Sequence, residues 1–243
     1  GHWETLPDGG RVWRLRITSP SAHAIYLIYN RWVIRKPCEL FLYNDDRSEV
    51  FGPYTSANNF DFDSTNVTPL VNGDATTLEY HVPAGVADFG ELSVSRVLHQ
   101  FRGFHADSSP IDSFGQSGAC HININCPEGA GWQAQKRAVA VMFTPNGHVC
   151  SGALINNVRQ DGIPYFLAAN HCYPTGNSSS FLFRFNYESP TCANIDGPYN
   201  QVVANAVIEA RQDPSDFLLL RLSQVPPISY NPYYAGWNRS GLY

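Results

Sequence analysis

The stretch that decides the fold is residues 165–172, which reads Tyr-Phe-Leu-Ala-Ala-Asn-His-Cys. Its first five residues are apolar, as expected for a short strand that is buried in a β-sheet. The strand would carry His171 to its carboxyl end, with Cys172 directly beside it. This pattern predicts an imidazole, which can take up a proton near neutral pH, at the mouth of a buried strand.

A second stretch supplies a carboxylate in a similar setting. Residues 214–222 read Pro-Ser-Asp-Phe-Leu-Leu-Leu-Arg-Leu, so that Asp216 stands at the start of a strongly apolar strand. The two stretches resemble the histidine and aspartate motifs of trypsin-like serine proteases. In such enzymes an imidazole takes the proton of a serine hydroxyl, and a carboxylate orients the imidazole. The resemblance implies that His171 is the general base and Asp216 its orienter, with Asp213 as the fallback candidate.

The resemblance sharpens at residues 117–129, which read Ser-Gly-Ala-Cys-His-Ile-Asn-Ile-Asn-Cys-Pro-Glu-Gly. This segment is similar to the amino-terminal segment of bacterial lysyl endopeptidases, and the similarity extends over residues 117–243. It implies two disulfides, Cys150 with Cys172 and Cys126 with Cys192. By the same resemblance Cys120 would pair with a cysteine of a second barrel. The second barrel is absent from this chain, and we expect the chain to bind it as a partner.

The nucleophile is the main departure from the family pattern. Nothing after Asp216 reads like Gly-Asp-Ser-Gly-Gly, and the remaining serines, at 223, 229 and 240, have no such frame. We therefore expect this chain to be the amino-terminal portion of a serine endopeptidase that is inactive alone and acts on protein or peptide substrates. A preference for lysine or other basic residues is part of the family resemblance, but its pocket would lie in the missing part.

Short alternating strands separated by turn residues predict an all-β protein. We expect a β-sandwich or jelly roll over residues 1–103, similar to a propeptide domain of a zymogen, where it could assist folding or block the cleft. A linker over 104–117 and the amino-terminal barrel of a trypsin-like protease over 118–243 follow. The predicted strands are 13–17, 24–29, 39–43, 77–82, 91–98, 138–143, 149–155, 165–169, 181–185, 202–208 and 217–222.

Composition excludes several classes of protein. The net charge is −5 and the charges are scattered, so no cationic face is available for nucleic acid. No apolar run approaches the ~20 residues that span a bilayer, so no membrane partner is expected. Six cysteines without a C-x-x-C pair favour disulfides in an oxidising compartment. We expect a secreted protein, extracellular or periplasmic, that needs no cofactor.

Other interpretations of the same residues remain open at this stage. A zinc site at Cys120, His121 and Cys126 would make a metal-dependent hydrolase, although the spacing suits zinc poorly. Asp61 and Asp63 could ligate calcium, and residues 115–118 superficially resemble a nucleophile elbow. The main alternative function is a non-catalytic secreted or surface binding protein built on a protease-like barrel.

Overall fold

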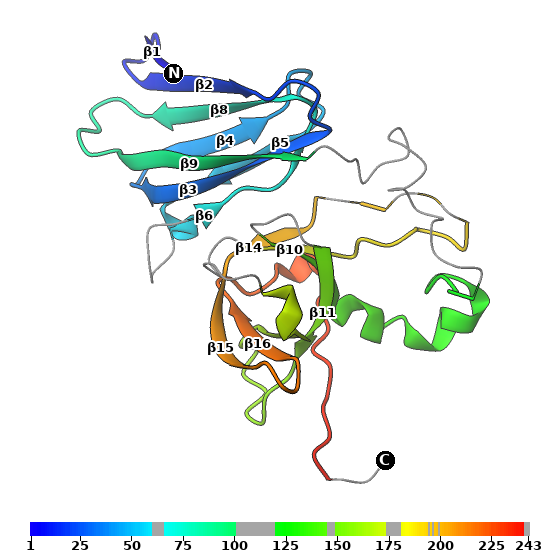
Figure 1. The fold of residues 1–243 in the computed structure, drawn as a ribbon. Coiled ribbons are helices and arrows are strands. Elements are labelled where there is room, and N and C mark those ends of the chain that lie inside the picture. Colours follow the sequence, from blue (N-terminus) through cyan, green and yellow to red (C-terminus); the bar gives the residue numbers. More distant parts are fainter. Residues whose placement is uncertain are drawn as a thin grey trace. The chain divides into compact units, whose positions relative to one another are not determined.

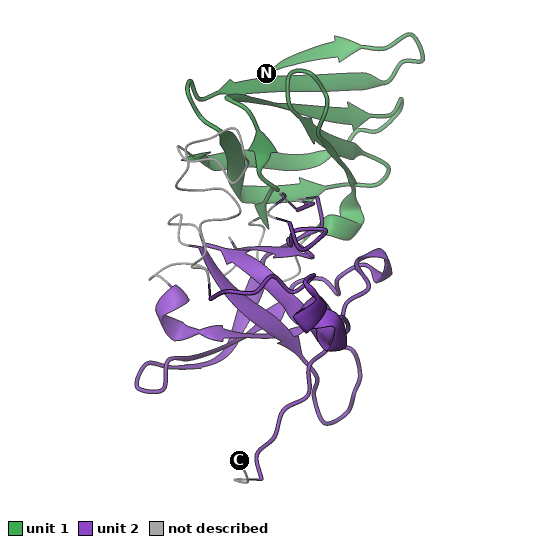
Figure 2. Cartoon of the chain, turned by 90° about the vertical axis from the view of Figure 1, so that its right-hand side faces the viewer, with its two compact units in different colours: residues 1–103 green, residues 104–243 purple. Residues whose placement is uncertain are grey.

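The computed structural model describes residues 1–59, 66–100, 120–144, 149–173, 181–193, 195, 197–198 and 200–240. The regular elements in these residues are β-strands and short 3-10 turns, which confirms the prediction of an all-β protein. None of the helical turns in these ranges is long and apolar enough to cross a membrane. The chain divides into two compact units, residues 1–103 and 104–243, coloured separately in Figure 2. The expected linker over 104–117 lies outside the described residues.

Unit 1 contains two antiparallel sheets (Figure 1). The five-stranded sheet has the order β1-β2-β8-β4-β5. In the other sheet, β3 pairs with β9 along its length and with the short strands β6 and β7. The bounds are β1 His2–Thr5, β2 Arg11–Thr18, β3 Ala24–Ile34, β4 Glu39–Tyr43, β5 Val50–Tyr54, β6 Asn66–Val67, β7 Val71–Asn72, β8 Ala75–Val82 and β9 Gly90–Gln100, with the 3-10 turn η1 at Ser56–Asn58.

One apolar core holds these two sheets together. Its buried members alternate along the strands of both sheets, so that each sheet turns one face inward. From β3 come Ile25, Leu27, Tyr29, Trp32 and Ile34, and from the other sheet Leu40, Leu42, Leu78, Tyr80 and Val82. Trp13, Leu15 and Ile17, at alternate positions of β2, pack against the same cluster. Unit 1 therefore has a core of its own.

On the face of the five-stranded sheet that points away from the core, the carboxylate of Glu79 is surrounded by several hydrogen-bond donors. Glu79 accepts hydrogen bonds from Arg14 Nε at 2.7 Å and from the Tyr43 hydroxyl at 2.8 Å, and His81 Nε2 lies 2.8 Å from its other oxygen. Burial alone would raise the pKa of Glu79, but the hydrogen bonds from Arg14, His81 and Tyr43 outweigh burial and lower the pKa to about 2. The native state thus favours the ionised form of Glu79 more than the unfolded state does.

This network predicts how stability depends on pH. A depressed pKa contributes stability that is fully present above the unfolded pKa, about 4.5, and is lost as the pH falls towards about 2. We expect Glu79→Gln to lower the free energy of unfolding at pH 7 by about 2 kcal/mol and to flatten its decline between pH 4.5 and 2. Denaturant unfolding across this pH range measures both effects. The control is Glu91→Gln, which removes an exposed ion pair with Arg31 and should change little. An acid-unfolding curve unchanged by Glu79→Gln would contradict the prediction.

Unit 2 is built on one seven-stranded antiparallel sheet with the order β14-β13-β10-β11-β12-β16-β15. The strands are β10 Val139–Phe143, β11 Val149–Ile155, β12 Tyr165–Ala169, β13 Leu182–Phe185, β14 Val202–Ala204, β15 Ala206–Gln212 and β16 Phe217–Leu222. The 3-10 turns are η2 Pro127–Trp132, η3 Gln135–Ala138, η4 Asn170–Cys172 and η6 Ile228–Tyr230. The two edge strands, β14 and β15, follow one another in the chain with only Asn205 between them. A flat sheet could not join its edges through one residue, so the sheet is strongly curled.

The core of unit 2 lies on the inner side of this curled sheet. Its buried residues include Met142, Leu154, Phe166, Phe183 and Leu220 from five neighbouring strands. The rings of Phe166 and Phe183 meet edge to face, with their centroids 4.9 Å apart. The apolar residues of the strands thus form the inner face of the sheet. A shift of one residue in strand pairing would turn them outward, so their burial fixes the strand register.

Several strand predictions need correction. The run 202–208 is two strands, because Asn205 adopts a left-handed backbone with φ of 67° and sends the chain from one sheet edge to the other. Strand β3 continues beyond residue 29 to Ile34, across register shifts next to Tyr29 that break the alternation. Strands β1, β5, β6 and β7 were not predicted. All four residues of β1 are exposed, β5 contains Gly52 and Pro53, and β6 and β7 are only two residues long.

Candidate active site

The pairing of β12 with β16 brings the two candidate catalytic residues together. Ala169 is the last residue of β12 and pairs with Phe217, the first residue of β16. His171 lies two residues beyond one strand end and Asp216 one residue before the other. The backbone N–H of Asn170 donates to the carbonyl of Asp216 at 2.9 Å, which extends the pairing into the turn. Two residues far apart in sequence therefore meet because of the register of one strand pair.

A tight turn presents the carboxylate of Asp216. Residues 213–216 connect β15 to β16, and the backbone N–H of Asp216 donates to the carbonyl of Asp213 at 3.1 Å. Pro214 suits the second position of such a turn because its φ is already fixed. Asp216 has a φ of 53°, in the left-handed region that aspartate tolerates better than most residues. The local sequence thus explains the direction in which the Asp216 side chain leaves the strand.

Asp216 contacts His171 through both carboxylate oxygens. Oδ1 accepts from the backbone N–H of His171 at 2.7 Å, and Oδ2 lies 2.6 Å from Nδ1 of the imidazole. These two hydrogen bonds, the backbone one first, hold the pKa of Asp216 below its usual range. Asp216 is therefore ionised at neutral pH and can only accept, so Nδ1 must carry the proton. In the neutral imidazole this leaves Nε2 unprotonated and able to take a proton from another group.

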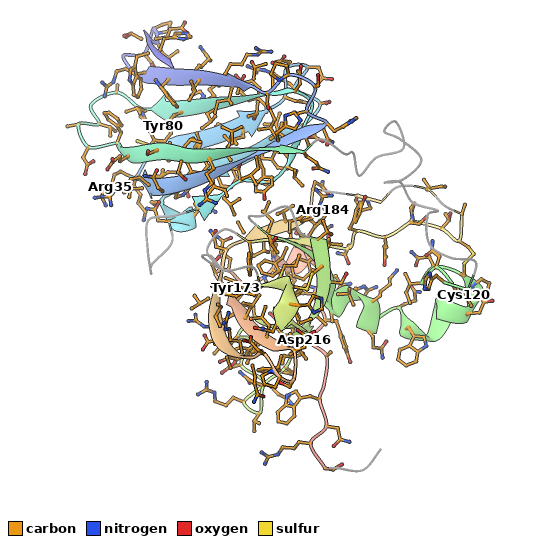
Figure 3. All side chains as sticks on the ribbon, viewed as in Figure 1. Arg35, Tyr80, Cys120, Tyr173, Arg184 and Asp216 are labelled. Atoms are coloured by element: carbon orange, nitrogen blue, oxygen red, sulfur yellow. A yellow bond between two sulfur atoms is a disulfide. The ribbon has the colours of Figure 1, made fainter. Side chains whose placement is uncertain are left out.

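The pair is open to solvent in this chain. The His171 side chain is 72% exposed and the Asp216 side chain 48% exposed. Both residues lie beyond the last paired residues of β12 and β16, His171 in η4 and Asp216 in the turn 213–216. Figure 3 labels Asp216 and Tyr173, the residue that follows η4. Geometry, and not burial, keeps the histidine and the aspartate together here.

Two disulfides brace unit 2. Cys150, in β11, is bonded to Cys172, the residue after His171, and Cys126 is bonded to Cys192. The first bond fixes η4 to the curled sheet directly beside the imidazole, which limits the freedom of a group that must be oriented. Among the described residues, Cys38 is a buried free thiol and Cys120 an exposed one.

The disulfides also bear on possible metal sites. In the described ranges, Cys150, His171 and Cys172 bring their potential ligand atoms within 4.8 Å of one another. The two sulfurs are bonded to each other, so neither is available as a thiolate ligand. Cys126 is likewise unavailable to the zinc site considered with Cys120 and His121. The proposed calcium ligands Asp61 and Asp63 and the segment 115–118 lie outside the described residues.

Sequence reasoning did not find the partner of Asp213. The side chain of Asn170 donates a hydrogen bond from Nδ2 to Oδ1 of Asp213, so Asp213 faces Asn170 instead of His171. Asp213 had been the fallback candidate for the orienting carboxylate. This contact follows from the register of β12 and β16, which places residue 170 opposite the turn 213–216.

Comparisons with known proteins assign both units to the same family. The family model "Lysyl endopeptidase, C-terminal domain" matches residues 114–243, more than half of the chain, and "Lysyl endopeptidase N-terminal domain" matches residues 2–101. A lysyl endopeptidase from Pseudomonas aeruginosa is 28% identical over 189 residues, which cover 72% of this chain and 40% of the relative. The chain therefore belongs to the lysyl endopeptidase family.

Proposed function

We propose that this chain carries the general base and its orienting carboxylate for a secreted serine endopeptidase. The observation that carries the proposal is the contact of Nδ1 of His171 with Asp216 at 2.6 Å, which leaves Nε2 free to accept a proton. A base of this kind is what a serine hydroxyl needs before it can attack a peptide carbonyl. Membership of the lysyl endopeptidase family supports the same chemistry.

The proposed reaction assigns each group one task. Nε2 of His171 takes the proton of the serine hydroxyl as its oxygen attacks the peptide carbonyl carbon. The carboxylate of Asp216 stabilises the imidazolium that forms and holds its orientation. The imidazolium then gives the proton to the leaving amine nitrogen as the peptide bond breaks. No serine after Asp216 lies in a sequence motif typical of the nucleophile. In this proposal, the serine is supplied by a further part of the protein, a second barrel.

The two units take different parts in this proposal. Unit 2, with its curled sheet and disulfides, is the first barrel of a trypsin-like protease, and unit 1 is a propeptide-like sandwich of a zymogen. The family model that matches unit 1 and the separate apolar core of that unit support this division. The disulfides suit an oxidising, extracellular or periplasmic location. The alternative of a non-catalytic binding protein has no comparable support from the relatives.

A fluorophosphonate probe, which labels activated serines, tests the proposal. The probe is applied to the protein expressed from its complete reading frame, and the labelled peptide is identified by mass spectrometry. We expect one labelled serine outside residues 1–243, and we expect His171→Ala to abolish the labelling. A complete protein that is folded and free of inhibitor but remains unlabelled would overturn the proposal and favour the binding protein.

The name of the family suggests the first substrates. We propose cleavage after lysine, with arginine as the closest competitor, because the family and its Pseudomonas aeruginosa member are lysyl endopeptidases by name. Peptides that differ only in lysine, arginine or norleucine before the scissile bond separate a preference for basic residues from simple length and hydrophobicity. A higher kcat/KM for norleucine than for lysine would contradict this part of the proposal.

A further inference from the structure

Asn170 forms hydrogen bonds with both ends of the turn that presents Asp216. Its side-chain Nδ2 donates to Oδ1 of Asp213, the first residue of the turn. Its backbone N–H donates to the carbonyl of Asp216, the last residue of the turn. Asn170 is 9% exposed, whereas Asp213 lies at the surface. A single, nearly buried residue thus connects the segment that carries His171 to the segment that carries Asp216.

These hydrogen bonds of Asn170 are important because the histidine–aspartate pair is exposed to solvent. Hydrogen-bonded pairs in contact with solvent compete with water and add little stability by themselves. With Asp216 about half exposed, its bond to His171 contributes little to fixing the distance between η4 and the turn 213–216, whereas Asn170, the donor to Asp213, is nearly buried. That distance must be set by contacts on either side of the pair, and the side-chain hydrogen bond from Asn170 to Asp213 is one of these contacts.

A second contact acts on the other end of η4. The guanidinium of Arg211, in β15, lies 5.0 Å from the ring centroid of Tyr173, which follows η4. The backbone N–H of Tyr173 donates to the carbonyl of Asn170 at 2.9 Å and closes the 3-10 turn. The hairpin of β15 and β16 therefore contacts the chain on both sides of His171, at Asn170 and at Tyr173.

We propose that Asn170 and Asp213 are positioning residues, which hold the turn 213–216 so that Asp216 reaches Nδ1 of His171. This inference rests on the proposed function for its importance in catalysis, but the contact itself can be tested without activity. Neither residue touches the reacting atoms. Their effect is to maintain a geometry in which the Asp216 carboxylate accepts two hydrogen bonds from one residue.

The test follows the carboxyl group of Asp216 by carbon-13 NMR titration in the 243-residue chain. The hydrogen bonds from His171 keep the pKa of Asp216 low, so a displaced turn should raise this pKa towards its ordinary range. We expect an upward shift in Asn170→Ala and in Asp213→Ala. Asp213→Asn keeps an acceptor oxygen and should restore the low value. Ser215→Ala is the matched control, because Ser215 lies in the same turn but contacts Gln212.

The outcomes separate this inference from the proposed function. An unchanged titration of Asp216 in both alanine variants would overturn the inference, whatever the activity of the complete protein. Asp213→Ala changes only a surface residue, so it provides the answer if Asn170→Ala fails to fold. In the complete protease we expect both alanine variants to lower kcat roughly ten- to a hundredfold with little change in KM. A fall in kcat with Asp213→Asn as large as with Asp213→Ala would also count against the positioning role.

Discussion

Replacement of Asp216 by asparagine is expected to lower kcat of the proposed complete protease by roughly ten-thousandfold. An asparagine can turn its amide nitrogen towards Nδ1 of His171, and the imidazole would then carry its proton on Nε2. A protonated Nε2 cannot accept the proton of the serine hydroxyl. The large effect therefore comes from the wrong tautomer of the base, with the fold and the substrate contacts intact.

Steady-state kinetics on a lysyl peptide measure this effect, and circular dichroism checks the fold. Asp161→Asn is the matched control. Asp161 also accepts a side-chain hydrogen bond, from Asn157 at 2.7 Å, but it lies in the loop that precedes β12, at the end of the strand away from His171. We expect this control to keep nearly full activity. A loss of less than tenfold in Asp216→Asn would show that Asp216 is not the orienting carboxylate.

Removal of the disulfide beside His171 is expected to lower the stability of unit 2 markedly. Cys150 and Cys172 are 22 residues apart in sequence. Cross-linking a loop of this length restricts the unfolded chain and stabilises the fold by roughly 3 kcal/mol. For a unit of this size, Cys150→Ala combined with Cys172→Ala should lower Tm by about 10 °C. Calorimetry on the complete chain measures the change.

The same variant should loosen the segment that carries His171. The comparison is the double variant Cys126→Ala with Cys192→Ala, which removes the other disulfide of unit 2. That variant should also unfold at a lower temperature, but the titration of Asp216 should stay as in the wild type. A Tm within about 2 °C of the wild type after loss of Cys150 and Cys172 would contradict the stabilising role of their disulfide.

The parts of the fold that could be predicted from the sequence are those with strong apolar runs. Strands β12 and β16 have the predicted bounds, because each is a mostly apolar run that ends at polar residues. The edge strands were harder. Residues 202–208 were predicted as one strand, and only the left-handed backbone at Asn205 reveals the change of partner. Pairing partners are not encoded in local alternation, so the topology required the structure.

The candidate site shows the same division. His171 and Asp216 were named from two local motifs, and the structure places them in contact. The contact between Asn170 and Asp213 was not foreseen, because it joins two turn residues whose meeting depends on the register of β12 and β16.

Nitrogen-15 NMR of the His171 imidazole tests the central claim most directly, because nitrogen shifts distinguish the two neutral tautomers. The measurement is made on the 243-residue chain at a pH where the ring is neutral, with Asp216→Ala as the comparison. The contact with Asp216 predicts a proton on Nδ1 and a bare Nε2, and it predicts that this preference disappears in the variant. A proton on Nε2 in the wild-type chain, or the same tautomer in both proteins, would contradict the account.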